Sequence, residues 1–454
     1  MTVKADSFAR MLKRAHKLHV DGRHQDAREY CDNLLKRYSK YPTLRFLSAV
    51  VDLAIGNYEA AAAALERICR EHPAFADGWE QLGECFKKQL RWELSAMCYR
   101  RVMALAPERI SAVNKCAVVR SAQGDVHEAI SLFQAAAGMN HKHDADRYNR
   151  AYARLLIGAY QQGFDDHEAR MPADLVPVGK KGRTHARYWD GSQVPGTVML
   201  LEEQGVGDTL MMLRYLPLLE GRSDHFALMV RPALVPLLDG QWPHVEVIPT
   251  TTTEPLEHRA CLQVMSLPHL IPGGPLEGKP FLKKPAIHPL PRKRLPVRLA
   301  FCWKGNPAQG DDQTRSIPLE AWRPLLEMSG VEWVSVQVPA TVKERQLMLE
   351  LGIRNAGADC QDFAQTALVM GDCDGVVSVD TSVAHLSGAL GCPTILLKSA
   401  IPDWRWGMVE DVSTWYSSIR ILRQQVAMQW DGVMGAVGAL LNHTLRLAAA
   451  GARR

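Results

Sequence analysis

The chain has 454 residues, which is enough for about three domains. Hydrophobic residues make up 47% and charged residues 23%, a balance that is typical of a globular protein and excludes a disordered or collagen-like chain. The net charge of +5, from 54 basic and 49 acidic residues, is too small to indicate a protein whose main role is nucleic-acid binding.

The cysteines and the N-terminus predict a cytoplasmic protein. The ten cysteines form no C-x-x-C pair, so we expect reduced, mostly buried thiols. The first 20 residues are charged throughout and lack the apolar core of a signal peptide. The longest apolar run, 433–441, is about half of what a membrane span needs, and no membrane span is expected.

A pattern of 34 residues recurs in the first third of the chain. Units start near residues 8, 42, 76 and 110, and a fifth from 144 fits less well. Each unit predicts a helix pair in which Gly56 or Gly124 marks the turn and Pro73 or Pro107 ends the unit. A small residue such as Gly83 lets the two helices approach closely. One pair cannot bury its apolar face alone, so the pairs are expected to stack into an α-solenoid.

This period resembles the tetratricopeptide repeat (TPR) family over residues 8–141. The resemblance implies a concave surface that docks a peptide or protein, although the array is also compatible with a purely structural spacer. The side chains expected to line this surface are mixed in charge and indicate no particular ligand: Glu80, Glu84, Lys87 and Asn114.

The pattern changes after residue 170. Proline and glycine accumulate over 171–196, which is typical of a linker. The following segments alternate between strand and helix, which predicts a parallel α/β sheet. We expect strands at 197–204, 225–230 and 245–250, a tight loop at 205–208, and helices at 209–220 and 232–238.

Residues 278–298 contain five prolines, seven Lys or Arg and no acidic residue, so we interpret them as a second, solvated linker. A nucleic-acid or membrane patch is the less favoured alternative, because the rest of the chain does not extend it. A second α/β unit follows. It has expected strands at 297–303, 331–337, 375–380 and 393–398, and expected helices at 382–391 and 430–450.

Two such units predict two doubly wound, Rossmann-like domains whose strands direct their carboxyl ends toward a ligand cleft. The predicted domains are a repeat domain at 1–170, a first α/β half at 171–290 and a second half at 291–454.

Polar residues follow the first predicted strand, from Glu203 through Gln204, Gly205 and Gly207 to Asp208. The glycines would let backbone N–H groups approach a ligand, but the dinucleotide fingerprint lacks its third glycine. Asp208 is either a cap of the helix that starts at Thr209 or a chemical group.

In the second unit, the strand ending at 380 delivers Asp380, Thr381 and Ser382 to a helix N-terminus, which is typical of an anion site. His385 on the first turn would add a proton donor, unless it is satisfied inside the core. Lys304 and Asn306 follow the strand that ends at Trp303, and Arg315 comes shortly afterwards.

Several motifs carry a resemblance to bacterial TPR-linked glycosyltransferases of the heptosyltransferase-like branch of the GT-B fold. They are Trp189-x-Gly191, EQGVGDTL (203–210), FCWKGNP, RSIP, SVDTSVAHLSGALGCP and PDWRW, in this order over residues 150–430. The resemblance implies a GT-B arrangement and transfer of a sugar from a nucleotide-sugar donor without a bound metal or cofactor. Ser382, where heptosyltransferases usually carry glycine, and Gln365, in place of an acid, depart from the pattern and leave the sugar open.

The resemblance also implies roles for single residues. Asp208 matches the aspartate that serves as the base. The donor side comprises Lys304, Asn306, Arg315, Asp380, Thr381, Ser382 and His385, and the acceptor side comprises Glu203, Gln204, Gly205 and Gly207. From their position, Glu202 and Glu203 are rival bases, although Glu203 and Gln204 are also expected to fix the loop.

Three other groups are candidate sites. Asp372 and Asp374 form a D-x-D pair, but they precede a strand and so lie at the wrong end for a metal in the cleft. His141 and His143 fall in a repeat turn and are expected to be solvated. Trp404 and Trp406 are expected either to pack on the C-terminal helix or to form the wall of a base pocket.

We therefore expect a glycosyltransferase that acts on a protein presented by the TPR array. The alternative is a protein-binding scaffold with an inactive or regulatory glycosyltransferase-like domain.

Overall fold

The computed structural model describes residues 2–139, 144–170, 177–178, 182–183, 187–252, 257–273, 277–283, 296–307 and 312–451. The chain divides into two compact units, Met1–Ala153 and Arg154–Arg454. His141 and His143, and most of the predicted linkers, lie outside the described residues.

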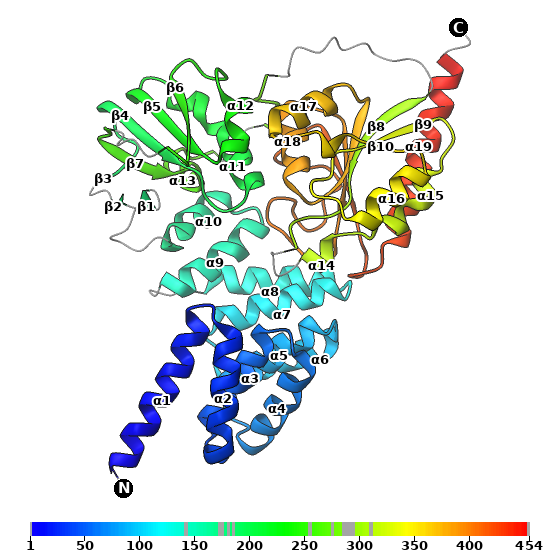
Figure 1. Ribbon diagram of the computed structural model, residues 1–454. Helices are drawn as coiled ribbons and strands as arrows, with labels where there is room; N and C mark the ends of the chain where they lie inside the picture. Colours follow the sequence, from blue (N-terminus) through cyan, green and yellow to red (C-terminus); the bar gives the residue numbers. More distant parts are fainter. Residues whose placement is uncertain are drawn as a thin grey trace. The chain divides into compact units, whose positions relative to one another are not determined.

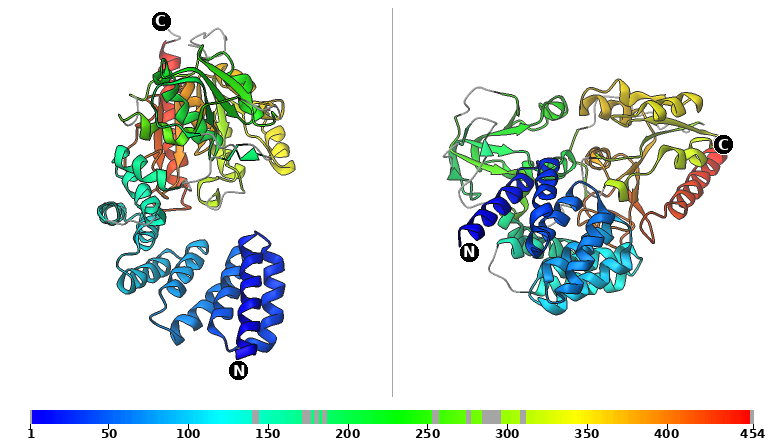
Figure 2. Two further views of the ribbon diagram at one scale, coloured as in Figure 1. Left: turned by 90° about the vertical axis from the view of Figure 1, so that its left-hand side faces the viewer. Right: turned by 60° about the horizontal axis from the view of Figure 1, so that its bottom comes forward.

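The first unit is a stack of antiparallel helix pairs (Figures 1 and 2). Its helices are α1 (Thr2–Val20), α2 (His24–Tyr38), α3 (Pro42–Ala54), α4 (Tyr58–Glu71), α5 (Ala76–Lys88), α6 (Trp92–Leu105), α7 (Ile110–Ala122), α8 (Val126–Gly138) and α9 (Asp144–Leu156). Three pairs begin at the predicted residues 42, 76 and 110, and the fifth begins at 144. The helical solenoid predicted from the period is thus confirmed.

The turn inside each pair requires a left-handed backbone at the same place in the repeat. Gly56 and Gly124 have φ of +88° and +94° there, which glycine adopts without a Cβ penalty. Leu90 occupies the equivalent position with φ of +60°. Gly83 lets helices α5 and α6 approach closely, because a Cβ at this position would lie only 2.8 Å from the ring of Tyr99.

The charged side chains predicted to line the repeat surface are largely paired with one another. The Glu80 carboxylate accepts from Arg109 at 2.9 Å and from Lys115 at 2.7 Å. Glu84 accepts from the Tyr99 hydroxyl, and the Asn114 amide donates to the carbonyl of Asn149 at 2.6 Å. These groups hold the helix pairs in register.

The second unit contains two all-parallel sheets. The smaller sheet has the strand order β3-β7-β4-β5-β6. Its strands are β3 (Arg187–Tyr188), β4 (Val194–Leu201), β5 (Ser223–Val230), β6 (Val245–Pro249) and β7 (Ala260–Gln263). Its helical segments are α11 (Val206–Met212), η2 (Leu213–Leu219), η3 (Pro232–Leu234), α12 (Val235–Leu238), η4 (Val264–Ser266) and α13 (Leu267–Leu270).

Three predictions for this region were wrong in detail. Residues 187–196 are not linker, because β3 pairs with β7, a strand that the sequence pattern did not reveal, and Trp189 is buried. Residues 205–208 are not a separate loop, because α11 already begins at Val206. The segment 209–220 is not one helix, since Pro217 removes a backbone donor and the chain tightens into the 3₁₀ helix η2.

The larger sheet has the strand order β10-β9-β8-β11-β12-β13, drawn in yellow to orange in Figure 1. Its strands are β8 (Val297–Cys302), β9 (Val331–Ser335), β10 (Arg354–Asn355), β11 (Gly375–Val379), β12 (Thr394–Lys398) and β13 (Ile419–Arg423). Numbered from β8, this order is 3-2-1-4-5-6, the order of a doubly wound sheet that reverses between β8 and β11.

The helices of this half are α14 (Asp312–Arg315), η5 (Leu319–Trp322), α15 (Arg323–Leu326), α16 (Val342–Glu350), η6 (Ala356–Ala358), α17 (Phe363–Gly371), α18 (Ser382–Leu390) and α19 (Asp431–Gly451). Its core gathers Phe301, Trp303, Trp322 and Trp333 against α19.

Three short segments lie outside these sheets. They are α10 (Tyr160–His167), η1 (Glu168–Arg170) and the two-stranded sheet of β1 (Pro177–Val178) and β2 (Gly182–Arg183). Helix α10, the second helix of the fifth pair, belongs to the second unit, where Phe164 contacts Trp404 and Trp415.

The described start of the second predicted linker is packed rather than solvated. Leu282 is buried, and the backbone N–H groups of Phe281 and Leu282 both donate to the carbonyl of Ala389. The reason is the apolar pair Phe281–Leu282, whose Phe281 ring also lies 5.1 Å from the guanidinium of Arg214. Among the described residues, no helix combines the length and the apolar character that a membrane span requires.

Candidate functional site

A cavity of about 960 Å³ lies where the carboxyl ends of both sheets of the second unit meet. The first half contributes residues 204–208 after β4 and Arg231 after β5. The second half contributes Cys302 and residues 304–307 at the end of β8, and residues 380–383 with His385 after β11. These two strands flank the reversal of strand order. A doubly wound sheet binds its ligands at this place.

Most of the predicted site residues line this cavity. They are Gln204, Gly205, Gly207, Asp208, Lys304, Asn306, Arg315, Asp380, Thr381, Ser382 and His385. Glu203 is not brought to the cavity lining. Its two carboxylate oxygens accept from Nε and an NH2 group of Arg170, each at 2.7 Å, and Arg170 also donates to Ser266. This ion pair anchors the loop after β4.

Asp208 lies in the first turn of α11 and is held on both sides. Its Oδ2 accepts from the backbone N–H of Gly205 at 3.0 Å, so it caps the helix from inside rather than from the expected position before it. Its Oδ1 accepts from Nε of Arg405 at 2.6 Å. The Arg405–Asp208 ion pair joins the two halves of the unit.

Arg405 is not among the predicted site residues, although it lies in the PDWRW motif. Its guanidinium also contacts both oxygens of Asp403 at 3.1 Å. Burial opposes ionisation of Asp403, but the positive charges of Arg405 and Lys398 outweigh it and lower the pKa of this carboxyl to about 2. The separation of 197 residues from Asp208 explains why no local pattern could reveal the contact.

On the opposite side, Thr381 and Ser382 lie at the start of α18, where Ser382 is half-buried. The hydroxyl of Thr381 lies 3.3 Å from Oγ of Ser378 and makes no cap bond within its helix. Asp380 is buried, accepts from Nε1 of Trp406 at 2.8 Å and lies 3.7 Å from Nζ of Lys398. Asp380 therefore supports the loop from behind.

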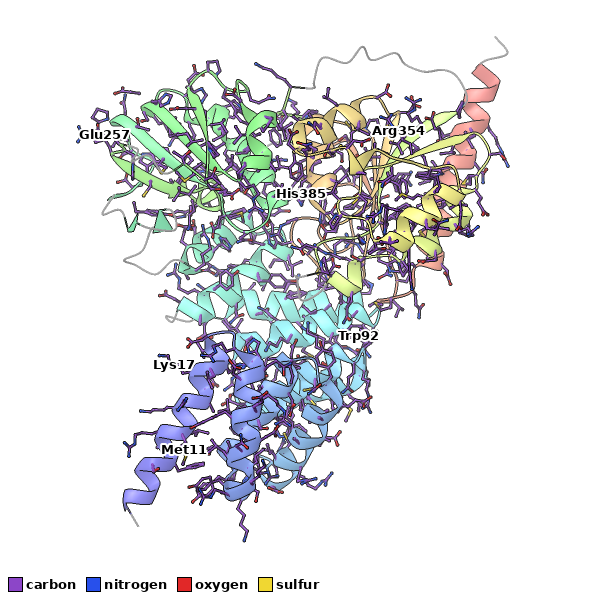
Figure 3. The ribbon with its side chains drawn as sticks, viewed as in Figure 1. Met11, Lys17, Trp92, Glu257, Arg354 and His385 are labelled. Atoms are coloured by element: carbon purple, nitrogen blue, oxygen red, sulfur yellow. The ribbon has the colours of Figure 1, made fainter. Side chains whose placement is uncertain are left out.

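His385 is buried between the halves, on α18 (Figure 3). Its Nδ1 lies 3.0 Å from the hydroxyl of Tyr416, and its ring packs 4.8 Å from that of Trp406. Burial lowers the pKa of His385 to about 4, so the ring is neutral near pH 7. This arrangement matches the alternative in which His385 is satisfied inside the core.

The remaining predicted cations are paired. Nζ of Lys304 contacts Oε1 of Glu344 at 2.7 Å and Oε2 at 2.5 Å. Nε of Arg315 contacts Asp312 at 3.0 Å. Asn306 is among the residues that line the cavity.

Trp404 and Trp406 match neither expectation, packing on the C-terminal helix or forming the wall of a base pocket. Trp406 packs on His385 and Tyr416, and Trp404 packs on Phe164 and Trp415, so neither lies on α19 or lines the cavity. The reason is that the loop after β12 folds back over α18 instead of toward the C-terminal helix.

Asp372 and Asp374 lie at the amino end of β11. Asp372 forms an ion pair with Arg298, whose backbone N–H donates to Asp374 at 2.8 Å.

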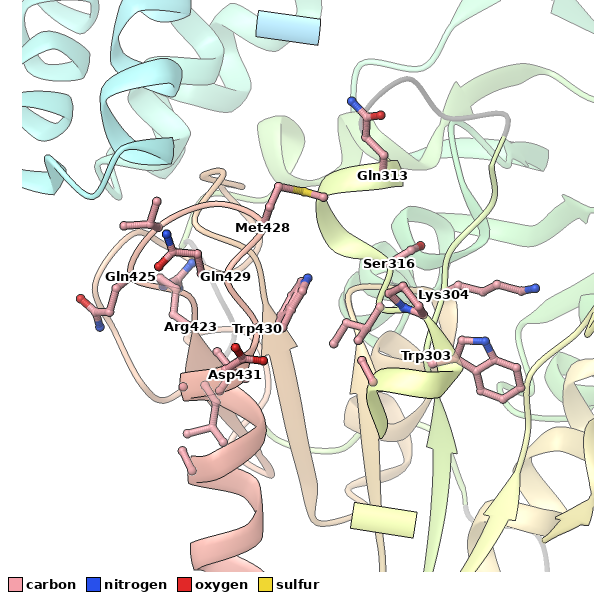
Figure 4. Close-up of a pocket in the computed structure, with 18 of the residues that line it drawn as sticks. Trp303, Lys304, Gln313, Ser316, Arg423, Gln425, Met428, Gln429, Trp430 and Asp431 are labelled. Carbon is pink, nitrogen blue, oxygen red and sulfur yellow. The ribbon is translucent and has the colours of Figure 1, made fainter. Parts of the chain in front are cut away.

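A second cavity of about 1030 Å³ lies at the ends of β8 and β13 (Figure 4). Trp303, Ser316, Arg423 and Trp430 are among its lining residues, and Lys304 is the one predicted site residue that it shares.

Comparison with known proteins identifies the repeats. Residues 20–81 match the tetratricopeptide repeat family model. The chain is 25% identical to Protein FlbA of Caulobacter vibrioides over 386 residues, 76% of this chain and 64% of FlbA. The chain thus spans a little under two thirds of that relative's length, and the match extends beyond the 153 residues of the first unit.

Solved structures that resemble the chain include repeat proteins that match about a third of it. A thermophilic TPR protein of Thermus thermophilus has a TM-score of 0.31 at 16% identity, covering 35% of this chain and 87% of its own. YrrB, described as a TPR protein with an unusual peptide-binding site, has a TM-score of 0.26 at 19% identity, covering 36% and 86%. The N-terminal repeats of this chain are tetratricopeptide repeats, a class that binds proteins.

Proposed function

We propose that the second unit is a glycosyltransferase that moves a sugar from a nucleotide-sugar donor to an acceptor, with inversion and without a bound metal. The observation that carries this proposal is the shared cavity. Asp208 of the first half and Thr381 and Ser382 of the second half all line it, at the reversal of strand order. The motifs that resemble heptosyltransferase-like GT-B enzymes supply most of its lining.

In this proposal the donor's anionic group binds at the start of α18. The free backbone N–H groups of a helix N-terminus and the hydroxyls of Thr381 and Ser382 suit an anion there. The acceptor hydroxyl lies near Asp208, whose carboxylate takes its proton as the oxygen attacks the anomeric carbon. The bond from that carbon to the donor phosphate oxygen breaks, and the nucleotide leaves with its electron pair.

We propose a protein as the acceptor, because the same chain carries TPR repeats. Repeat arrays of this class present extended surfaces to protein partners. The partner binds the first unit and offers a side-chain hydroxyl to the cavity of the second.

A second candidate is a scaffold whose cavity binds a nucleotide without turning it over. The observation that favours it is the Arg405–Asp208 ion pair, because the guanidinium already occupies the carboxylate oxygen Oδ1 that a base would offer to an acceptor hydroxyl.

One experiment separates the two candidates. Thermal unfolding of the full chain is recorded with a panel of nucleotide sugars, and the stabilising sugar is then tested for hydrolysis and transfer. Stabilisation with release of the nucleotide supports the enzyme. Stabilisation without any release supports the scaffold, and a panel without stabilisation contradicts both. A ligand at 100 times its Kd stabilises by about 2.7 kcal/mol.

A further inference from the structure

The described part of the cavity lining carries equal numbers of opposite charges. Its basic side chains are Arg231, Lys304, Arg315 and Arg405, and its acidic ones are Asp208, Asp362, Asp380 and Asp403. Each of the four basic side chains already contacts a carboxylate, at distances of 2.5 to 3.0 Å. A phosphate that enters this cavity and binds one of these cations would therefore compete with a carboxylate that the cation already contacts.

Arg405 is the cation best placed for such an exchange. Its guanidinium is shared by two carboxylates, Asp208 on the first half and Asp403 on its own loop. Oδ1 of Asp403 also accepts a hydrogen bond from the backbone N–H of Arg405 at 2.9 Å. Loss of Asp208 would thus leave Arg405 anchored and still charge-compensated by Asp403.

The Arg405–Asp208 pair also lies beside the start of α18. Trp406, the next residue, packs on His385 of that helix at 4.8 Å. Gly207, the residue before Asp208, packs against the same histidine, since a Cβ there would lie 2.5 Å from its Cδ2. A phosphate at Thr381 and Ser382 would therefore be close to the Arg405 guanidinium.

We infer that Arg405 binds the anionic group of the donor by exchanging Asp208 for it, so that donor binding releases the base. This inference rests on the proposed function and adds a binding residue and an order of events to it. Asp403 keeps Arg405 in place during the exchange. The released Asp208 carboxylate then accepts the proton of the acceptor hydroxyl, and a chain without donor keeps its base neutralised.

The test is isothermal calorimetry of the full chain with ADP, CDP, GDP and UDP, followed by variants with the tightest binder. Arg405→Gln should weaken binding by about ten- to one-hundredfold, because one charge-assisted contact to phosphate is lost. Asp208→Asn should tighten binding by about three- to tenfold, because the competing carboxylate is gone. The double variant should bind like Arg405→Gln alone.

The sign of the Asp208→Asn effect is decisive. A merely structural ion pair predicts that both single variants weaken binding, because each would loosen the contact between the halves. Arg298→Gln is the matched control, because the Arg298 guanidinium also contacts two carboxylates, those of Glu332 and Asp372, and lies outside the cavity lining; it should change affinity less than threefold, within about 0.6 kcal/mol.

The outcomes separate this inference from the function on which it rests. If the wild-type chain binds a nucleotide but Asp208→Asn binds it equally or more weakly, the exchange is wrong and the proposed function stands. If the wild-type chain binds none of the four nucleotides, both fail. Should Arg405→Gln not fold, as judged by its melting curve, the comparison of Asp208→Asn with wild type still decides.

Discussion

Gly207 of α11 packs directly against His385 of α18, so close that a Cβ on Gly207 would lie 2.5 Å from Cδ2 of the imidazole. One helix comes from each half of the second unit, and their contact lies beside the Arg405–Asp208 ion pair. The absence of a side chain at position 207 thus sets how closely the two halves approach at the cavity.

Gly207→Ala should therefore force α11 away from α18. We expect a loss of about 1–3 kcal/mol in the free energy of unfolding, as in other overpacked contacts, and weaker nucleotide binding. Urea denaturation and calorimetry measure the two effects. Gly435→Ala is the control, because a Cβ there meets no atom within 4 Å in helix α19. Equal stability of the two variants would contradict the close contact.

Asp208→Asn should separate a base from a helix cap. The amide keeps an oxygen that can accept from the Gly205 N–H but cannot take a proton. We expect turnover of the nucleotide sugar to fall by about 10²–10⁴-fold, with the melting temperature within a few degrees of wild type. A folded variant with near-normal turnover would show that Asp208 serves only the helix and the ion pair.

Acid should destabilise the second unit through its buried histidines. Burial lowers the pKa of His385 to about 4 from 6.5, and that of His167 to about 3. Between pH 6.5 and 4 the unfolded chain therefore binds protons that the folded chain does not, so stability falls as pH falls through this window. Above pH 6.5 neither histidine contributes a pH dependence.

The loss from His385 alone is on the order of 3 kcal/mol. Urea midpoints of wild type and His385→Gln from pH 7.5 to 4.5 measure it. The urea midpoint of the variant should fall less steeply as the pH falls. The part of the fall that protonation of His167 causes should remain. An identical decline would mean that His385 titrates normally in the folded chain.

The left-handed turns of the repeats predict a backbone cost for any side chain. Gly56 has φ of +88°, and a Cβ there would meet only the Tyr58 hydroxyl at 4.0 Å, so Gly56→Ala tests conformation without a clash. We expect a loss of about 1–2 kcal/mol in the stability of the first unit.

Gly138→Ala is the matched control for this variant. Gly138 lies in α8 without a positive φ, and a Cβ there meets nothing within 4 Å, so alanine should be neutral or stabilise by up to about 1 kcal/mol. Far-UV circular dichroism during urea denaturation compares the two variants with wild type. A stabilising Gly56→Ala substitution would refute the conformational argument.

Glu203→Gln should act on stability rather than on the chemical step. Both carboxylate oxygens of Glu203 are held by Arg170, which is itself nearly buried. Removing the charge leaves Glu168 as a carboxylate that still contacts the Arg170 guanidinium, at 2.8 Å, and we expect a loss of about 1–3 kcal/mol. Chemical denaturation measures it. A loss of turnover without a loss of stability would instead support the role on the acceptor side that the sequence predicts for Glu203.

The sequence by itself determined the helix pairs and most of the strands. The 34-residue period predicted the helix starts at 42, 76 and 110, because apolar spacing and turn glycines are properties of short segments. Buried apolar runs likewise predicted β5, β8, β11 and β12. Since parallel strands bring their carboxyl ends to one edge, the sequence also predicted which loops would meet at the cavity.

Only the tertiary structure decided what each polar group in those loops contacts. Asp208 meets Arg405 from 197 residues away, and Glu203 meets Arg170 from 33 residues before it. The short strand β3 exists because β7 pairs with it, and His385 is neutral because Gly207, Trp406 and Tyr416 enclose it. Ion pairs, strand pairing and burial depend on contacts between distant segments, and no local pattern of residues contains them.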